Sequence, residues 1–110
     1  MLHISGHPFT EPEVIGAWKG PDIPAIFAIY SRDETLCASA LKLVFVGEID
    51  SLARPGFPKS NTQYDDWLRC VGCAGALYLS YMPMPGSDSE ARRDVAQSLI
   101  HDLGPECNRC

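Results

Sequence analysis

The sequence predicts a single α+β domain with a small three-stranded antiparallel sheet flanked by helices. The chain has 110 residues, enough for one hydrophobic core and no more. It holds three short apolar runs typical of strands and, near its end, a segment with apolar residues at helical spacing. We therefore expect residues 1–110 to form one domain, with a core spanning 23–108 and an N-terminal helical extension at 10–18.

The three predicted strands are rich in β-branched and aromatic residues. Residues 23–31 form a nearly unbroken apolar run, and residues 41–48 place Val and Phe where β-sheets favour them. Because only a modest loop separates these two runs, we expect them to pair as an antiparallel hairpin. The third strand is expected at 76–82, where a Pro- and Gly-rich segment ends it.

Two short helices are expected before the third strand. In residues 10–18, Thr10 can cap the helix, Pro12 suits its first turn, and two glutamates favour the positive end of the helix dipole. Residues 62–70 place Tyr, Trp and Leu at helical spacing. A single helical turn is also expected at 49–53.

The clearest predicted element is a helix that begins near residues 87–90. The sequence Ser-Asp-Ser-Glu at these positions matches a capping box, and the helix should end at Gly104 and Pro105. An apolar residue recurs at every fourth position, which predicts an amphipathic helix packed on the sheet. The residues of this stripe are Ala91, Val95, Leu99 and Leu103, with Ile100 beside them.

Charge and composition narrow the class of function. The net charge of −5 argues against a general nucleic-acid coat, which needs excess Lys and Arg to neutralise phosphates. Arg92 and Arg93 are adjacent, and such a pair is typical of a solvated helix face. The sequence shows no signal peptide and no apolar stretch long enough to span a bilayer, so we expect no membrane partner and a cytoplasmic location.

Four of the five cysteines form two C-x-x-C pairs, Cys70 with Cys73 and Cys107 with Cys110. A two-residue gap lets both thiolates of a pair reach one tetrahedral ion, so the pattern predicts a structural Cys₄ zinc site. The expected strand and antiparallel last helix would return the second pair close to the first. Two alternatives remain: two pairs of quiet buried thiols, or redox-active dithiols.

Three short motifs occur in order along the chain: residues 28–30 (AIY), residues 45–47 (FVG) and residues 99–108 (LIHDLGPECN). In this order they resemble the two signatures and the terminal pattern of the GIY-YIG nuclease superfamily. Arg93 matches an arginine that lies one turn before the glutamate of that family. The resemblance spans residues 23–108 and implies a GIY-YIG-like fold.

The resemblance implies phosphodiester hydrolysis, in which a glutamate holds one divalent ion, a tyrosine positions water and an arginine neutralises the phosphate. Tyr30 takes the first tyrosine position, and Phe45 takes the second without its hydroxyl. The arginine position falls on Pro55, with Arg54 one residue early. Asn108 is the asparagine of the terminal pattern. Tyr30, Arg54 and Asn108 are therefore vestigial catalytic candidates.

The position implied for the metal-binding glutamate is Ala96, so we expect no bound magnesium. The expected function is that of a catalytically degenerate GIY-YIG-like binding module for nucleic acid or protein, which these residues favour over an enzyme. One alternative is an active endonuclease with a rearranged site that uses Tyr30, Arg54 and a carboxylate such as Glu48 or Asp50. A further alternative is a thiol redox protein built on the cysteine pairs.

Overall fold

A computed structural model of the chain describes residues 2–4, 6–14, 20–32, 41–53, 57, 64, 65, 67 and 77–104. The elements in these segments form an α+β fold. None of the helices in them is long and apolar enough to cross a membrane. In chain order the elements are β1 (Leu2–Ile4), β2 (His7–Phe9), β3 (Glu13–Val14), β4 (Ala25–Arg32), β5 (Leu41–Ile49), β6 (Leu77–Pro83) and α2 (Ser89–Leu103).

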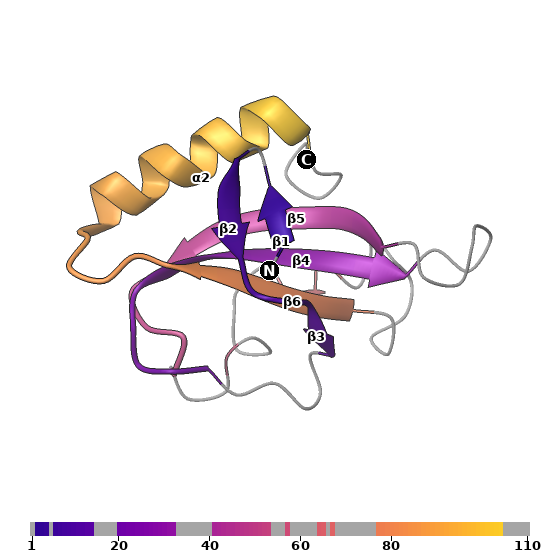
Figure 1. Ribbon diagram of the computed structural model, residues 1–110, viewed down its shortest axis with the longest axis horizontal. Coiled ribbons are helices and arrows are strands. Elements are labelled where there is room, and N and C mark those ends of the chain that lie inside the picture. The colour runs from indigo at the N-terminus through magenta and orange to yellow at the C-terminus, as the bar shows by residue number, and fades with distance from the viewer. Residues whose placement is uncertain are drawn as a thin grey trace.

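The described strands form two antiparallel sheets. The larger has four strands in the order β3-β6-β4-β5, and the smaller is the hairpin of β1 and β2. Strands β4 and β5 pair from Ala25 with Ile49 to Arg32 with Leu41, which confirms the predicted hairpin. Strand β6 then pairs with the other edge of β4, so β4 lies in the middle of the sheet (Figure 1).

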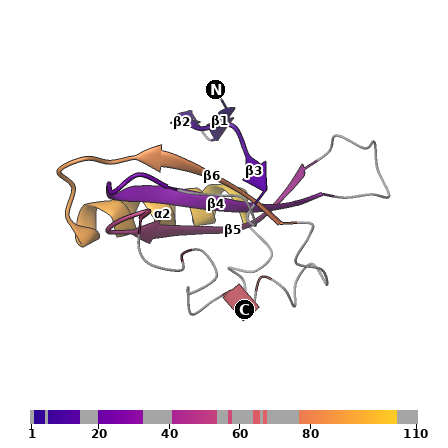
Figure 2. The same cartoon turned by 90° about the horizontal axis from the view of Figure 1, so that it is seen from below.

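The middle position of β4 follows from its composition. Its residues from Ala25 to Ser31 are all buried, whichever face of the sheet they occupy. A run that is apolar on both faces is stable only between two strands and two covering layers. One layer is α2, which packs against β5 and β4 on one face of the sheet (Figures 1 and 2).

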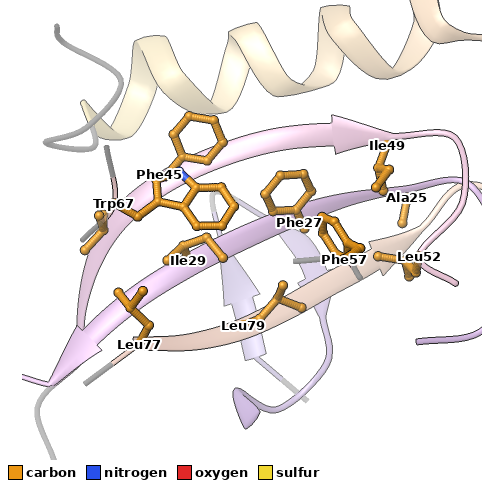
Figure 3. Close-up of a cluster of buried hydrophobic side chains, with 11 residues drawn as sticks. Ala25, Phe27, Ile29, Phe45, Ile49, Leu52, Phe57, Trp67, Leu77 and Leu79 are labelled. Atoms are coloured by element: carbon orange, nitrogen blue, oxygen red, sulfur yellow. The ribbon is translucent and has the colours of Figure 1, made fainter. Parts of the chain in front are cut away.

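The face of the sheet away from α2 carries an aromatic cluster. The ring of Phe27 lies 5.9 Å from the ring of Phe45 and 5.3 Å from that of Phe57, measured between centroids (Figure 3). Trp67 lies 5.2 Å from Phe45 and 5.9 Å from Phe27 in the same cluster. These edge-on and tilted arrangements are the ones that aromatic pairs favour, so this face is a packed core.

Helix α2 was predicted, and its end at Gly104 is confirmed. Gly104 has φ 56°, and its backbone N–H donates to the carbonyl of Ile100. The predicted capping box is wrong by one residue, because Asp88 is the N-cap and its carboxylate accepts from the N–H of Ala91 at 2.8 Å. Asp and Ser cap comparably well, and the Ser87 hydroxyl instead donates to the carbonyl of Met84.

The predicted apolar stripe of α2 is also displaced. Ala91 is exposed and Leu103 is 40% exposed, whereas Arg92, Ala96 and Leu99 form the buried face. Val95 and Ile100 only flank this face and are half-buried. The stripe was predicted from apolar residues alone. It missed the buried face because Arg92, the first residue of that face, is charged.

The predicted helix at residues 10–18 is wrong in its described part. Glu13 and Val14 form strand β3 and pair with Leu79 and Tyr78 of β6. The open edge of β6 offers backbone hydrogen bonds, and a β-branched residue such as Val14 favours a strand. The sheet therefore has four strands among the described residues, and the predicted count of three is wrong.

Two other predicted segments are described only in part. Tyr64, Asp65 and Trp67 are helical, as expected for residues 62–70, and the rest of that helix lies outside the described residues. The predicted turn at 49–53 starts later, because Ile49 still belongs to β5 and the turn is at Leu52 and Ala53.

Candidate functional site

Of the three vestigial catalytic candidates, Tyr30 is the one that lies within the described residues. It lies on β4 next to a β-bulge, where Ile29 pairs with Phe45 but Tyr30 pairs with Leu43. Its side chain is 6% exposed and belongs to the cluster beneath α2. The Tyr30 hydroxyl lies 2.9 Å from the hydroxyl of Ser80, and this pair of oxygens is buried.

Burial raises the pKa of Tyr30 above its ordinary value of 10.0, and the hydrogen bond with Ser80 offsets this only in part. A raised pKa keeps the phenol protonated at neutral pH. A tyrosine that activates water as a base needs the opposite shift, towards the working pH. The surroundings of Tyr30 therefore suit a structural hydroxyl and not a catalytic one.

Ala96 stands where the resemblance implies the metal-binding glutamate. It lies on the inner face of α2, is 4% exposed, and shares an apolar cluster with Tyr30 and Leu99. The position therefore does face the sheet beside the tyrosine. A carboxylate there would be buried among apolar groups, which is costly without a cation to compensate it. In this chain a methyl group fills the position.

The second tyrosine position of the resemblance lies on the other side of the sheet. Phe45 belongs to the aromatic cluster with Phe27 and Trp67, whereas Tyr30 belongs to the cluster beneath α2. The structure thus does not bring Tyr30 and Phe45 into one site.

The glycine of the second motif has a packing reason. A Cβ atom on Gly47 would lie 2.8 Å from the Phe27 ring and 2.8 Å from the Phe45 ring. Only a glycine lets both rings lie over this part of β5. The packing of the aromatic core therefore accounts for a glycine at position 47.

The carboxylates proposed for a rearranged nuclease site lie far along the sheet from Tyr30. Glu48 pairs with Ile26, four residues from Tyr30 on β4, which corresponds to about 13 Å along a strand. Asp50 follows at the far end of β5. This spacing does not favour a site in which Tyr30 and either carboxylate act together.

Glu48 instead binds Arg92 of α2. The Arg92 Nε donates to Glu48 Oε2 at 2.8 Å, and its Nη1 donates to the Ser87 carbonyl at 2.7 Å. Arg92 is 4% exposed, so its predicted place on a solvated helix face is wrong, although Arg93 is exposed as expected. The sequence does carry a signal for the buried position of Arg92. Arg92 lies four residues before Ala96, and residues at this spacing share one face of a helix.

A residue outside every predicted site completes the cluster around Tyr30. Phe9 of β2 is 1% exposed and packs in the same cluster as Ile26, Ala28 and Met82. The sequence signal was present, because two short runs separated by Ser5 and Gly6 are typical of a hairpin. Gly6 has φ 83°, the left-handed region that such turns require.

The remaining predicted site residues lie outside the described residues. These are Arg54, Asn108 and the proposed zinc ligands Cys70, Cys73, Cys107 and Cys110. Within the described ranges, no group of three or more His, Cys, Asp or Glu side chains could hold a metal ion.

One buried polar atom lies near the first cysteine pair in sequence. The indole Nε1 of Trp67 is buried and has no hydrogen-bond acceptor among the described residues. Trp67 precedes Cys70 by three residues. A buried N–H of this kind is rare and calls for an acceptor.

Comparisons with protein families, with curated proteins and with solved structures find no match to this chain. The chemistry of the site must therefore be argued from its own residues. In the described part, the region around Tyr30 is an apolar cluster with a hydroxyl pair, and an ion pair fixes the start of α2.

Proposed function

We propose that this chain is a catalytically inactive GIY-YIG-like domain that acts as a binding module. The observation that carries the proposal is the apolar packing of Ala96 against the cluster that contains Tyr30. A nuclease of this type needs a carboxylate and an open metal position there. Among the described residues, the cluster instead offers a methyl group and a protonated phenol, both of them buried.

The order of elements supports the resemblance. The hairpin of β4 and β5 carries the first two motifs of the resemblance, and after β6 helix α2 carries Arg93, Ala96 and the start of the terminal motif. Ala96 and Tyr30 share a cluster, as the glutamate and tyrosine positions would. In this proposal the fold of the family is retained, and the catalytic glutamate and second tyrosine are replaced by Ala96 and Phe45.

A protein is the partner that the charge favours. The net charge of −5 gives a nucleic acid no general electrostatic attraction, whereas a protein interface does not require excess positive charge. Nucleic-acid binding would then need a local basic site. The proposed compartment is the cytoplasm, because thiols stay reduced there and paired cysteines can then hold a metal.

We also propose that Cys70, Cys73, Cys107 and Cys110 hold one structural zinc ion. Four thiolates are a donor set that zinc prefers, and a bound thiolate sulfur could accept the orphaned Trp67 N–H. The path of helix α2 supports this proposal. The helix runs back along the sheet, and its C-terminal end lies at the end of the sheet where β6 begins (Figure 1).

A cleavage assay tests the loss of catalysis. The purified chain, with magnesium and either plasmid DNA or structured RNA, should give no cleavage above background. The Tyr30→Phe variant should behave identically, which controls for a contaminating nuclease. Magnesium-dependent cleavage that Tyr30→Phe abolishes would overturn the proposal and favour the rearranged endonuclease.

Metal analysis tests the zinc site. Freshly reduced protein should contain about one zinc per chain, and four thiols should react only after chelation. Cys37 lies outside both pairs, so a Cys37→Ser variant should retain the metal, whereas Cys73→Ser should lose it. Metal-free protein with five freely reactive thiols would contradict the site. A reversible disulfide within a pair would favour the redox alternative.

A further inference from the structure

The β1–β2 hairpin is not part of the central sheet. Its two strands pair with each other and form a sheet separate from the four-stranded sheet. The connection to the larger sheet begins at Thr10, whose N–H donates to the Tyr81 carbonyl at 2.9 Å. The Tyr81 N–H donates in turn to the Thr10 hydroxyl oxygen at 3.1 Å. Figures 1 and 2 show the hairpin lying outside the central sheet.

A single aromatic ring anchors the part of the hairpin whose side chains are described. Within residues 6–9, Phe9 is buried, His7 is half-buried, and Gly6 and Pro8 are exposed. Phe9 packs in the cluster that contains Ile26, Ala28, Tyr30 and Met82. Hairpins of two short strands are marginally stable on their own, so the packing of Phe9 should contribute strongly to keeping this one in place.

The surface under Phe9 joins an apolar floor to the edge of strand β6. Its floor is apolar, with Ile26 and Ala28 from β4 and Met82 from β6. Strand β3 pairs with β6 at Leu79 and Tyr78, and beyond them Tyr81 of β6 hydrogen-bonds to Thr10. An extended chain that pairs with a strand edge and inserts a side chain into a pocket is a recurrent mode of peptide recognition.

We propose that the hairpin is an internal cover of this surface, and that a protein partner presenting an aromatic side chain on an extended segment replaces Phe9. The inference rests on the proposed function as a protein-binding module. The partner should resemble the internal segment that it replaces. It should offer an extended backbone that can pair with the edge of β6 and one aromatic ring that can take the place of Phe9. Because the internal segment is tethered, its effective concentration is in the millimolar range, so it competes strongly with free ligands.

The test uses the full chain and a synthetic peptide that copies residues 1–14. The peptide is titrated into isotope-labelled wild-type protein and into the Phe9→Ala variant, with amide shifts of β4 and β6 as the readout. The variant, whose cover lacks its anchor, should bind the peptide at least about tenfold more tightly than wild type does. A peptide carrying Phe9→Ala should bind the variant at least about tenfold more weakly, and a His7→Ala peptide should bind it almost unchanged.

Absence of binding to the Phe9→Ala protein, or equal binding of the unaltered peptide and the peptide carrying Phe9→Ala, would overturn the proposal. Hydrogen exchange of the wild-type chain provides a test that needs no variant. The Thr10 amide should exchange at least about a hundredfold faster than the Phe27 and Ala28 amides, because the cover opens without global unfolding. Equal exchange rates would overturn the proposal as well. Neither result affects the cleavage and zinc assays, so failure of the docking surface is distinguishable from failure of the proposed function.

Discussion

The two faces of the central sheet are both buried, but different kinds of side chain cover them. The face with Phe27, Phe45 and Trp67 is packed by aromatic rings, and Gly47 makes room for two of them. The face beneath α2 contains the buried polar groups Tyr30, Ser80 and Arg92 alongside apolar residues, and Ser31 of β4 is a further buried polar side chain. Tyr30 is bound to Ser80, and Arg92 to Glu48.

The two faces are therefore held together in different ways, one by apolar packing and the other by apolar packing with buried hydrogen bonds. Among the described residues, the buried members of the aromatic cluster carry no polar side-chain group apart from the indole N–H of Trp67. The helix face holds Tyr30 and Ala96, two of the positions where the resemblance implies catalysis, and the polar side chains Tyr30 and Arg92 on this face are each hydrogen-bonded to another side chain. Buried polar groups that satisfy each other specify a fold, and they are not available to a substrate.

Phe9 and Phe27 allow the sharpest comparison, because both are phenylalanines with 1% exposure. Phe27→Ala should lower the free energy of unfolding by about 3–5 kcal/mol, because the middle strand cannot close the cavity. Phe9→Ala should cost about 1.5–3 kcal/mol, because the hairpin can withdraw and leave only the lost transfer energy. Chemical denaturation measures both. Equal costs would mean that the hairpin is an integral part of the core.

The two adjacent arginines give a matched pair on α2. Arg92→Met keeps the aliphatic stem but leaves Glu48, whose side chain is 26% exposed, without its partner. The expected loss is about 1.5–3 kcal/mol in unfolding free energy. Arg93→Met removes the same charge from an exposed position and should change stability by less than about 0.5 kcal/mol. If both variants lost the same stability in denaturation, net charge and not the ion pair would be the cause.

Gly47→Ala tests the aromatic face directly. The added methyl would overlap the rings of Phe27 and Phe45, and the expected cost is about 1–3 kcal/mol. A Phe45→Leu background should reduce that cost, because one of the two close contacts disappears. Thermal and chemical unfolding of the single and double variants measure the coupling. A Gly47→Ala variant as stable as wild type would show that the rings can move aside.

Among these buried positions, Tyr30 should show the smallest loss of stability, in the variant Tyr30→Phe. Loss of the hydrogen bond with Ser80 should cost about 0.5–1.5 kcal/mol at neutral pH. Burial raises the folded-state pKa of Tyr30 above 10.0, so its contribution is complete below the unfolded pKa and is lost as pH rises through the folded pKa. The stability difference between wild type and Tyr30→Phe should therefore shrink above pH 10. A constant difference would mean that Tyr30 ionises freely in the fold.

The elements predicted correctly from the sequence are those that depend on neighbouring residues. Apolar runs predicted the strands β4, β5 and β6, and a glycine predicted the end of α2. Strand β3 was missed because Glu13 and Val14 sit in a segment with good helix-start signals, and pairing with a distant strand overrode them. The core roles of Arg92 and Phe9 depend on tertiary contacts with β5 and the cluster beneath α2, which residue type does not reveal.

The candidate site around Tyr30 was also predicted only in part. The positions of Tyr30 and Ala96 were derived from motif order, and they do lie in one cluster. The separation of Phe45 onto the opposite face was not foreseen. It depends on the pairing of Phe45 with Ile29 beside a bulge, a register that the sequence does not specify.

The most direct test of an inactive, filled site is a search for metal binding beside Tyr30. Manganese can replace magnesium and broadens the NMR signals of nuclei close to it. We predict that the Ala96 methyl and the Tyr30 ring lose no more intensity than the Phe27 ring on the opposite face. Selective, saturable broadening centred on Ala96 and Tyr30 would show a metal site in this cluster and contradict the account.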